Sequence, residues 1–310
     1  MDPNHLKKKL LEQYDGTDLE DLDGLEEVET CQGSVFNIKS EDKLKFYLKN
    51  QEKAVECLIS DLKLVKGIGN SKENKLKLDG YNNLEDLQNH PRFGRAAGEV
   101  LSMIRSYDAQ TIASILCERY SQSHPQMLNT CSFTDIEDFI FMDIETLGLK
   151  NQPIILLGEA SISSDKITVN QYLLKDLNDE PAVLAAHLDS MNDNRVYVTF
   201  NGRSFDVPYI KDRLNYFQID HKLDHHHLDL LHFSRRFYGN HLPNCQLTTI
   251  EEHLLGMERV EDVPGSLVPD FYKTYLETDN IGPLIPIIEH NRDDIISLAR
   301  IISRMNEQID

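Results

Sequence analysis

The segment 138–145 is a short apolar and aromatic run that carries acidic residues at alternate positions, Asp143 and Glu145. A run of this length and composition predicts a buried β-strand. Side chains two residues apart on a strand lie on the same face, so we expect the two carboxylates side by side and Met142 and Ile144 against the core. Carboxylates this close repel each other unless a cation neutralises them. The segment therefore favours a metal-binding strand over a solvated polar face.

The strand runs into a loop, Thr146-Leu147-Gly148-Leu149, that suits the close approach of a ligand. We therefore expect Thr146 and Leu147 to contact a substrate. A set of ligands made only of carboxylate oxygens favours Mg²⁺ or Mn²⁺ over zinc, because both ions prefer oxygen donors.

A third acidic residue, Asp206, follows the predicted strand 195–200 in the segment NGRSFDVP, residues 201–208. The proline two residues later is typical of the first turn of a helix, so Asp206 should be an N-terminal residue of that helix. A helix cap is the alternative role for Asp206, and the nearby strand acids favour the metal ligand. We expect Asn201 to hydrogen-bond to a substrate and Phe205 to pack against a base or sugar.

The last predicted helix, 282–305, places His290 and Asp294 four residues apart and hence on one face. Asp294 is expected to bind the metal, and His290 to take a proton from the attacking water. Asp293 projects about 100° away and should face solvent. An apolar stripe on the opposite side of the helix predicts its buried face: Ile288, Ile295, Ile296, Ala299 and Ile302.

Strands and helices alternate from about residue 127 onward. The predicted strands are 138–145, 154–161, 166–174 and 195–200, and the predicted helices are 180–191, 208–216, 247–255, 269–277 and 282–305. This order predicts an α/β fold with a mixed sheet flanked by helices. At 310 residues the chain exceeds the usual size of one domain, and we divide it into three regions. These are an N-terminal region with a short helix and a small hairpin at 29–38 (1–50), a helical module (51–125) and the α/β domain (126–310).

The helical module contains the segment 64–72, LVKGIGNSK, which resembles a helix-hairpin-helix motif. In that motif two glycines, here Gly67 and Gly69, permit a tight turn, and the amides that begin the next helix meet a phosphate of nucleic acid. Lys66 and Lys72 would add positive charge there. Glu73 departs from the family pattern, because a small residue usually occupies that position. The alternative is a turn that only joins two helices.

The net charge of −20 opposes a nucleic-acid partner, because phosphate binding normally requires an excess of Lys and Arg. The distribution of charge weakens that objection. From residue 131 onward there are 30 acidic residues against 15 Lys and Arg, whereas 62–78 carries five lysines and one acid. Divalent cations held by acids would also present positive charge to a substrate.

No apolar run approaches the roughly 20 residues that span a bilayer, and the Lys-rich N-terminus lacks the apolar core of a secretory signal. We therefore expect a cytoplasmic protein without a membrane partner. The five cysteines are odd in number and widely spaced, so they indicate neither a disulfide framework nor a zinc site.

The acidic residues and their surroundings resemble the DEDD superfamily of ribonuclease-H-like 3′–5′ exonucleases, and more closely its YprB-like subfamily. The matching segments are 199–206, 228–236, 261–275 and 290–298. The resemblance implies two-metal hydrolysis of DNA or RNA, at ends or in single strands, with Asp143, Glu145, Asp206 and Asp294 as metal ligands. It places His290 at the position of the proton acceptor, although the spacing between His290 and Asp294 is that of the branch of the superfamily that uses Tyr there. Arg203 is a candidate phosphate contact.

Two other interpretations remain open on the sequence. Histidines and acids at 221–232 could form a metal site, but adjacent histidines point in different directions, so we expect a polar loop or a substrate-facing surface. Asp229 in that segment would either support the active site or cap a strand end. For function, the alternatives to a nuclease are a non-catalytic nucleic-acid-binding scaffold and a phosphodiesterase of small oligonucleotides.

Overall fold

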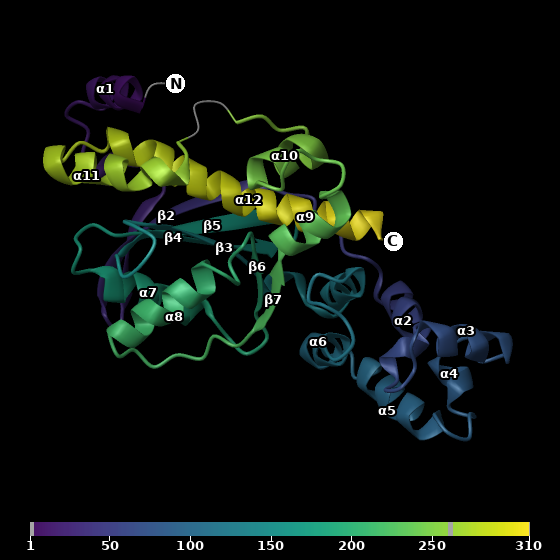
Figure 1. The fold of residues 1–310 in the computed structure, drawn as a ribbon. Helices are drawn as coiled ribbons and strands as arrows, with labels where there is room; N and C mark the ends of the chain where they lie inside the picture. The colour runs from purple at the N-terminus through teal and green to yellow at the C-terminus, as the bar shows by residue number, and fades with distance from the viewer. Residues whose placement is uncertain (1–2, 260–262, 310) are drawn as a thin grey trace.

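The computed structural model describes residues 3–259 and 263–309, so Glu261 and Asp262 of the family-like segments lie outside the described residues (Figure 1). Within the described ranges, no helix combines the length and the apolar character needed to cross a bilayer.

A seven-stranded mixed sheet forms the centre of the molecule. Its spatial order is β1-β2-β5-β4-β3-β6-β7. The pairs from β1 through β3 are antiparallel, and β3, β6 and β7 pair in parallel. The strands are β1 (Leu25–Thr30), β2 (Gly33–Lys43), β3 (Phe139–Thr146), β4 (Ile154–Ser163), β5 (Lys166–Leu173), β6 (Val196–Thr199) and β7 (His226–Asp229). The predicted mixed α/β architecture is confirmed.

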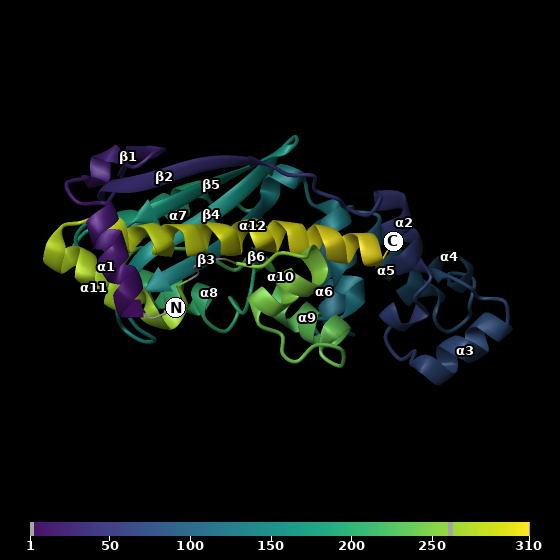
Figure 2. The ribbon, with the colours of Figure 1, turned by 90° about the horizontal axis from the view of Figure 1, so that it is seen from above.

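Helices cover both faces of the sheet. Figures 1 and 2 show α7 (Glu180–Ser190) and α8 (Asp206–Tyr216) on one face and the long helix α12 (Ile285–Gln308) lying across the other. Figure 1 also shows α9 (Leu230–Tyr238), α10 (Leu247–Leu255) and α11 (Val268–Thr278) on the α12 side. The predicted apolar stripe of α12 is buried throughout.

The N-terminal region contains the expected helix, α1 (Pro3–Gln13), and a hairpin made of β1 and β2. The hairpin is longer than the predicted 29–38. Its second strand pairs with β5 over eight residues, from Phe36 opposite Leu173 to Lys43 opposite Lys166. The hairpin therefore extends the same sheet that carries β3.

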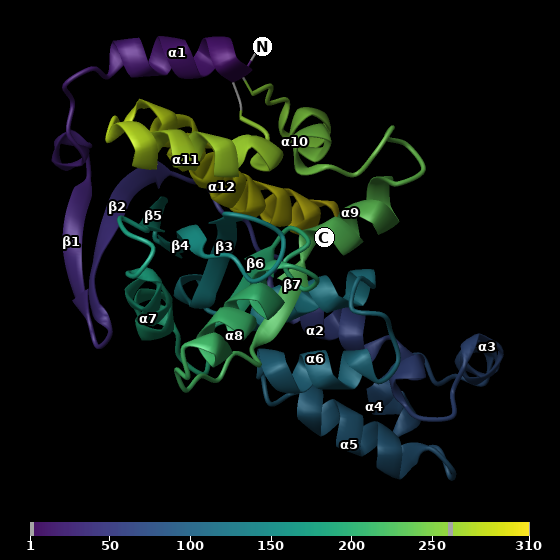
Figure 3. The same cartoon turned by 60° about the vertical axis from the view of Figure 1, so that its left-hand side comes forward.

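Residues 51–117 form five short helices at the β7 end of the sheet (Figure 3). They are α2 (Gln51–Ile59), α3 (Asn70–Leu78), α4 (Leu84–Leu87), α5 (Gly94–Ile104) and α6 (Ala109–Cys117). Asn83 caps α4, since its side chain accepts from the amide of Asp86 at 2.9 Å. Gly80 ends α3 with φ +96, a conformation that glycine adopts without strain.

The histidine-rich segment differs from its prediction as a polar loop, because His226–Asp229 is the edge strand β7. It pairs in parallel with β6, with Thr199 opposite Asp229. His227 is buried, and its Nε2 lies 2.8 Å from Thr199 Oγ1. A ring nitrogen satisfied inside the sheet explains how so polar a sequence forms a strand.

The close crossing of α12 over the sheet depends on Gly158. This residue lies on β4 directly opposite Asp143 of β3. A Cβ atom at position 158 would lie 2.0 Å from Asn291 Oδ1 and 2.3 Å from Ile295 Cδ1, both on α12. Only glycine therefore lets the helix approach this closely.

We predict that Gly158→Ala lowers the free energy of unfolding by about 1–3 kcal/mol, the usual cost of overpacking a core. Gly98→Ala on α5 is the matched control, because its Cβ would meet nothing nearer than Gln88 Oε1 at 3.7 Å. The control should gain up to about 1 kcal/mol, since alanine favours the helix. Urea unfolding of both variants measures the difference, and equal stabilities would contradict the account of the crossing.

Candidate active site

β3 places its two acids on the face that α12 covers. Asp143 is partly buried and Glu145 is buried. Met142 and Ile144 point to the opposite face and join the core beneath α7 and α8. The alternation predicted for this strand is thus observed.

Asn291 of α12 holds Asp143 in place. Its Nδ2 donates to the carbonyl oxygen of Asp143 at 3.1 Å and to Oδ2 of the same residue at 2.9 Å. Oδ1 of Asn291 accepts from Gln171 Nε2 of β5 at 2.9 Å. Sequence reasoning assigned no role to either amide. Asn291 lies within the family-like segment 290–298 and could have been suspected, whereas Gln171 has no local signal.

Asp206 is the first residue of α8, and the cap position before it is Phe205. Its Oδ1 accepts a hydrogen bond from the amide of Ile144 on β3 at 3.3 Å. The side chain is therefore turned toward the strand that carries the other acids, which supports the predicted ligand role over the cap.

α12 brings His290 and Asp294 to the same place. His290 Nε2 lies 3.8 Å from Glu145 Oε1 and 3.9 Å from Asp294 Oδ2. Asp293 points away, with its side chain 49% exposed and 3.6 Å from the guanidinium of Arg292. The predicted face of the helix is the one that meets β3.

The carboxylates influence one another strongly. Burial raises the pKa of Asp143 well above its usual range, and the negative charges of Asp294, Asp206 and Glu145 raise it further, while His290 opposes them. Burial likewise raises the pKa of Asp206 to about 7. It raises the pKa of Asp294 as well, against the lowering influence of His290 and Arg259. Negative charge is therefore in excess at a poorly solvated point.

This donor set fits a divalent cation. Buried carboxylates with raised pKa values are stabilised when a cation neutralises them, and oxygen ligands suit Mg²⁺ and Mn²⁺. In the described part of the chain, no three His, Cys, Asp or Glu side chains lie at the spacing of a metal site, so the fit rests on the chemistry of the donors.

Arg259, to which the sequence analysis gave no role, contacts the acid cluster. Nη1 of Arg259 lies 3.3 Å from His290 Nδ1, and Nη2 lies 2.5 Å from Asp294 Oδ1. A neutral ring that accepts at Nδ1 carries its proton on Nε2, the atom that faces the carboxylates. This contact does not favour the proton-acceptor role predicted for His290. Arg259 stands just before the family-like segment 261–275, so its position gave a weak signal.

The residues predicted to contact a substrate lie in loops next to Glu145 and Asp206 in the chain. Thr146 donates from Oγ1 to the carbonyl of Gly148 at 2.9 Å, which shapes the turn that carries Leu147. Asn201 has φ +69, and its amide donates to Asp229 Oδ1 at 2.8 Å.

Asp229 and Phe205 complete these loops. Asp229, the last residue of β7, also accepts from the amide of Leu231 and so caps the start of α9. The same side chain holds the loop at Asn201. The ring of Phe205 packs 5.3 Å from that of Tyr209, measured between centroids.

Arg203 is directed elsewhere. Its Nη2 donates to the carbonyl of His227 on β7, and burial lowers the pKa of the guanidinium. This side chain therefore reaches toward β7 rather than toward the four acids.

The predicted phosphate-binding residues belong to the helical module, which lies beyond β7 in Figures 1 and 3. Gly67 has φ +91, and Lys72 Nζ donates to its carbonyl at 2.7 Å. Lys66, Gly69 and the first residues of α3 are exposed. Glu73 is buried, accepts from the amide of Leu62 and pairs with Lys63 and Lys77, so two lysines neutralise its charge.

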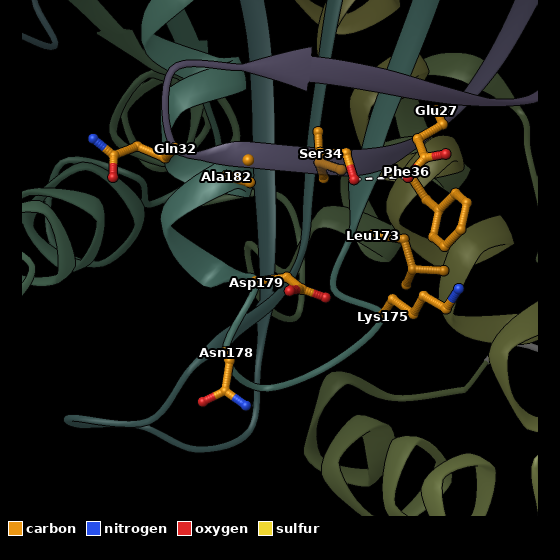
Figure 4. A pocket seen from close by; sticks show the side chains of 11 residues that line it. Glu27, Gln32, Ser34, Phe36, Leu173, Lys175, Asn178, Asp179 and Ala182 are labelled. Atoms are coloured by element: carbon orange, nitrogen blue, oxygen red, sulfur yellow. Dashed lines mark hydrogen bonds between the residues drawn. The ribbon is translucent and has the colours of Figure 1, made fainter.

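Two cavities lie in different parts of the molecule. A groove of about 940 Å³ runs beside α8 and is lined by Phe205 and Tyr209. A pocket of about 120 Å³ lies under the β1–β2 hairpin, where Figure 4 shows Phe36 of β2 near Lys175. None of the predicted site residues lines that smaller pocket.

A mixed sheet with helices on both faces, and acids meeting from β3, α8 and α12, defines a protein of the ribonuclease-H-like class. The chain belongs to the RNase_H superfamily, whose family profile matches residues 140–306, more than half of the chain. Members of this superfamily are generally nucleolytic and typically use divalent metal ions.

The chain is also similar to "Uncharacterized protein YprB" of Bacillus subtilis (strain 168). The two are 33% identical over 177 residues, which is 56% of this chain and 43% of the relative. The match thus spans less than half the length of that relative.

We predict that metal-free protein loses stability as pH rises from roughly 4 to 7. Asp206 keeps its proton to about pH 7 in the native state, whereas its ordinary pKa is 3.8. The native state binds more protons in that window, so the free energy of unfolding falls as pH rises. Asp206→Asn cannot titrate and should show a smaller fall in urea unfolding with EDTA at pH 5 and pH 8. An unchanged fall would show that Asp206 has an ordinary pKa.

Proposed function

We propose that this protein is a metal-dependent nuclease, specifically a 3′–5′ exonuclease that uses two divalent ions. The observation that supports this most is the meeting of four carboxylates from three separate elements, close enough to raise the pKa of Asp143 together. Burial of like charges costs free energy. A group of acids from three elements that are far apart in the sequence is therefore not expected without a compensating role.

Asp143, Glu145, Asp206 and Asp294 would hold the Mg²⁺ or Mn²⁺ ions. When bound, such ions supply Lewis-acid stabilisation of the charge that develops during phosphodiester hydrolysis. Asn291 holds the Asp143 carboxylate in place by a hydrogen bond from its Nδ2. His290 places its Nε2 between Glu145 and Asp294, where it can exchange a proton with a group bound there.

Loops around the acids would orient the end of the strand. Leu147 and Phe205 offer apolar contacts for a base or sugar, and Asn201 offers a polar side chain that is exposed. In the helical module, the exposed Lys66 and the amides that begin α3 would contact backbone phosphates. Such contacts position a strand without reading its sequence.

We predict that Asp143→Asn lowers hydrolysis of end-labelled DNA or RNA, with Mn²⁺ or Mg²⁺, by about 100-fold or more. The estimate follows because the ions provide several kcal/mol of transition-state stabilisation, and each 1.4 kcal/mol is about tenfold in rate. Asp293→Asn is the matched control, since Asp293 lies next to Asp294 but points to solvent. Its activity should equal that of the wild type.

The same assay separates the alternative functions. A wild type that binds oligonucleotides but never cleaves them would indicate a non-catalytic scaffold. Cleavage of short oligonucleotides only, unchanged by removal of the lysines of α3, would indicate a small-substrate phosphodiesterase.

We predict that Lys66→Ala combined with Lys72→Ala weakens oligonucleotide binding. The double variant should also lower the salt slope of the binding constant by about one for each phosphate that these lysines neutralise. Lys8→Ala is the control, because Lys8 is exposed, lies 3.8 Å from Glu12 and belongs to α1, which Figure 1 shows far from the helical module. Fluorescence anisotropy between about 50 and 200 mM salt measures both. Equal slopes for all three proteins would remove the helical module from the proposed binding surface.

A further inference from the structure

Arg259 reaches the acid cluster from the segment that follows α10. Its side chain is only 10% exposed. It approaches Asp294 through Nη2 and His290 through Nη1, the two residues that α12 contributes to the site. The guanidinium therefore meets the cluster on the side of α12.

Glu251 of α10 fixes the guanidinium from its other side. This carboxylate is 1% exposed and accepts from Arg259 Nε at 2.8 Å and from Nη2 at 2.5 Å. Two parallel hydrogen bonds between arginine and a carboxylate impose one orientation on both groups. Arg259 is thus held rigidly while it contacts α12.

We infer that Arg259, held by Glu251, is a positioning residue that sets the Asp294 carboxylate for metal binding. This inference rests on the proposed function. Arg259 contacts Oδ1 of Asp294. The other carboxylate oxygen, Oδ2, lies on the side of His290 and Glu145. Metal-binding carboxylates are themselves commonly held by hydrogen bonds, and removal of the partner typically costs about 10–100-fold in metal affinity.

A positive charge beside a metal site could instead repel the ion. The buried Glu251 decides against that outcome, because it pairs closely with Arg259 and cancels most of its charge at a distance. The local contact with Asp294 remains, since it depends on how closely Nη2 approaches Oδ1 rather than on the net charge of the Arg259–Glu251 pair. Removal of Arg259 should therefore weaken metal binding rather than strengthen it.

The test is the affinity for Mn²⁺ alone, measured from the electron paramagnetic resonance signal of free Mn²⁺ without any substrate. Arg259→Gln and the double variant Arg259→Gln/Glu251→Gln should both bind Mn²⁺ about 10–100-fold more weakly than the wild type. The double variant removes both charges, so a similar decrease in both would exclude net charge as the cause. Arg292→Gln is the control, because Arg292 lies on α12 but pairs with Asp42 of β2, and its affinity should equal that of the wild type.

Arg259→Lys keeps the charge but cannot form the paired hydrogen bonds, and it serves if the glutamine variant fails to fold in EDTA. It should also bind Mn²⁺ more weakly than the wild type. Wild-type affinity in Arg259→Lys, or equal or tighter binding by Arg259→Gln, would overturn the positioning role. A wild type that binds no Mn²⁺ would instead refute the proposed function, so the two failures are distinguishable.

Discussion

The close crossing of α12 over the β3–β4 pair is the constraint on which the rest of the site depends. Gly158 leaves room for the side chain of Asn291, which then reaches both the backbone and the carboxylate of Asp143. With that turn of the helix fixed, Asp294 and His290 fall over β3 as well. A shift of α12 over the sheet would move Asp294 and His290 away from the acids of β3.

The second constraint is electrostatic. Four carboxylates meet where solvent is scarce, and the pKa values of Asp143 and Asp206 rise in consequence. Such an arrangement costs folding free energy unless cations compensate it. The chain itself supplies Arg259 near Asp294, and Glu251 already shares that charge. The remaining excess of negative charge supports a site whose stable form contains divalent ions.

Local patterns predicted the parts of the site that depend on local geometry. The alternation of Asp143 and Glu145 on a strand, and the four-residue spacing of His290 and Asp294 on a helix, both follow from backbone periodicity. The central strands and the helices α7, α8, α10, α11 and α12 were predicted within a few residues for the same reason, whereas α9 was not predicted. The choice of Asp294 over Asp293 agrees with the exposure of Asp293.

Features set by pairing between distant segments could not be read in this way. The β1–β2 hairpin joins the sheet through β5, and the histidine-rich strand β7 is stabilised by β6. The contacts of Gln171 and Arg259 depend on how β5 and α10 meet α12. No pattern within either segment encodes such a meeting, because it is decided by packing between them.

The central claim is that Asp143, Glu145, Asp206 and Asp294 together hold divalent ions. The most direct measurement is an anomalous difference map from crystals grown with Mn²⁺. The account predicts peaks about 2.1 Å from oxygens of these carboxylates, the distance typical of small divalent ions. Crystals that diffract well and show no peak at the four acids, or peaks only elsewhere, would contradict it.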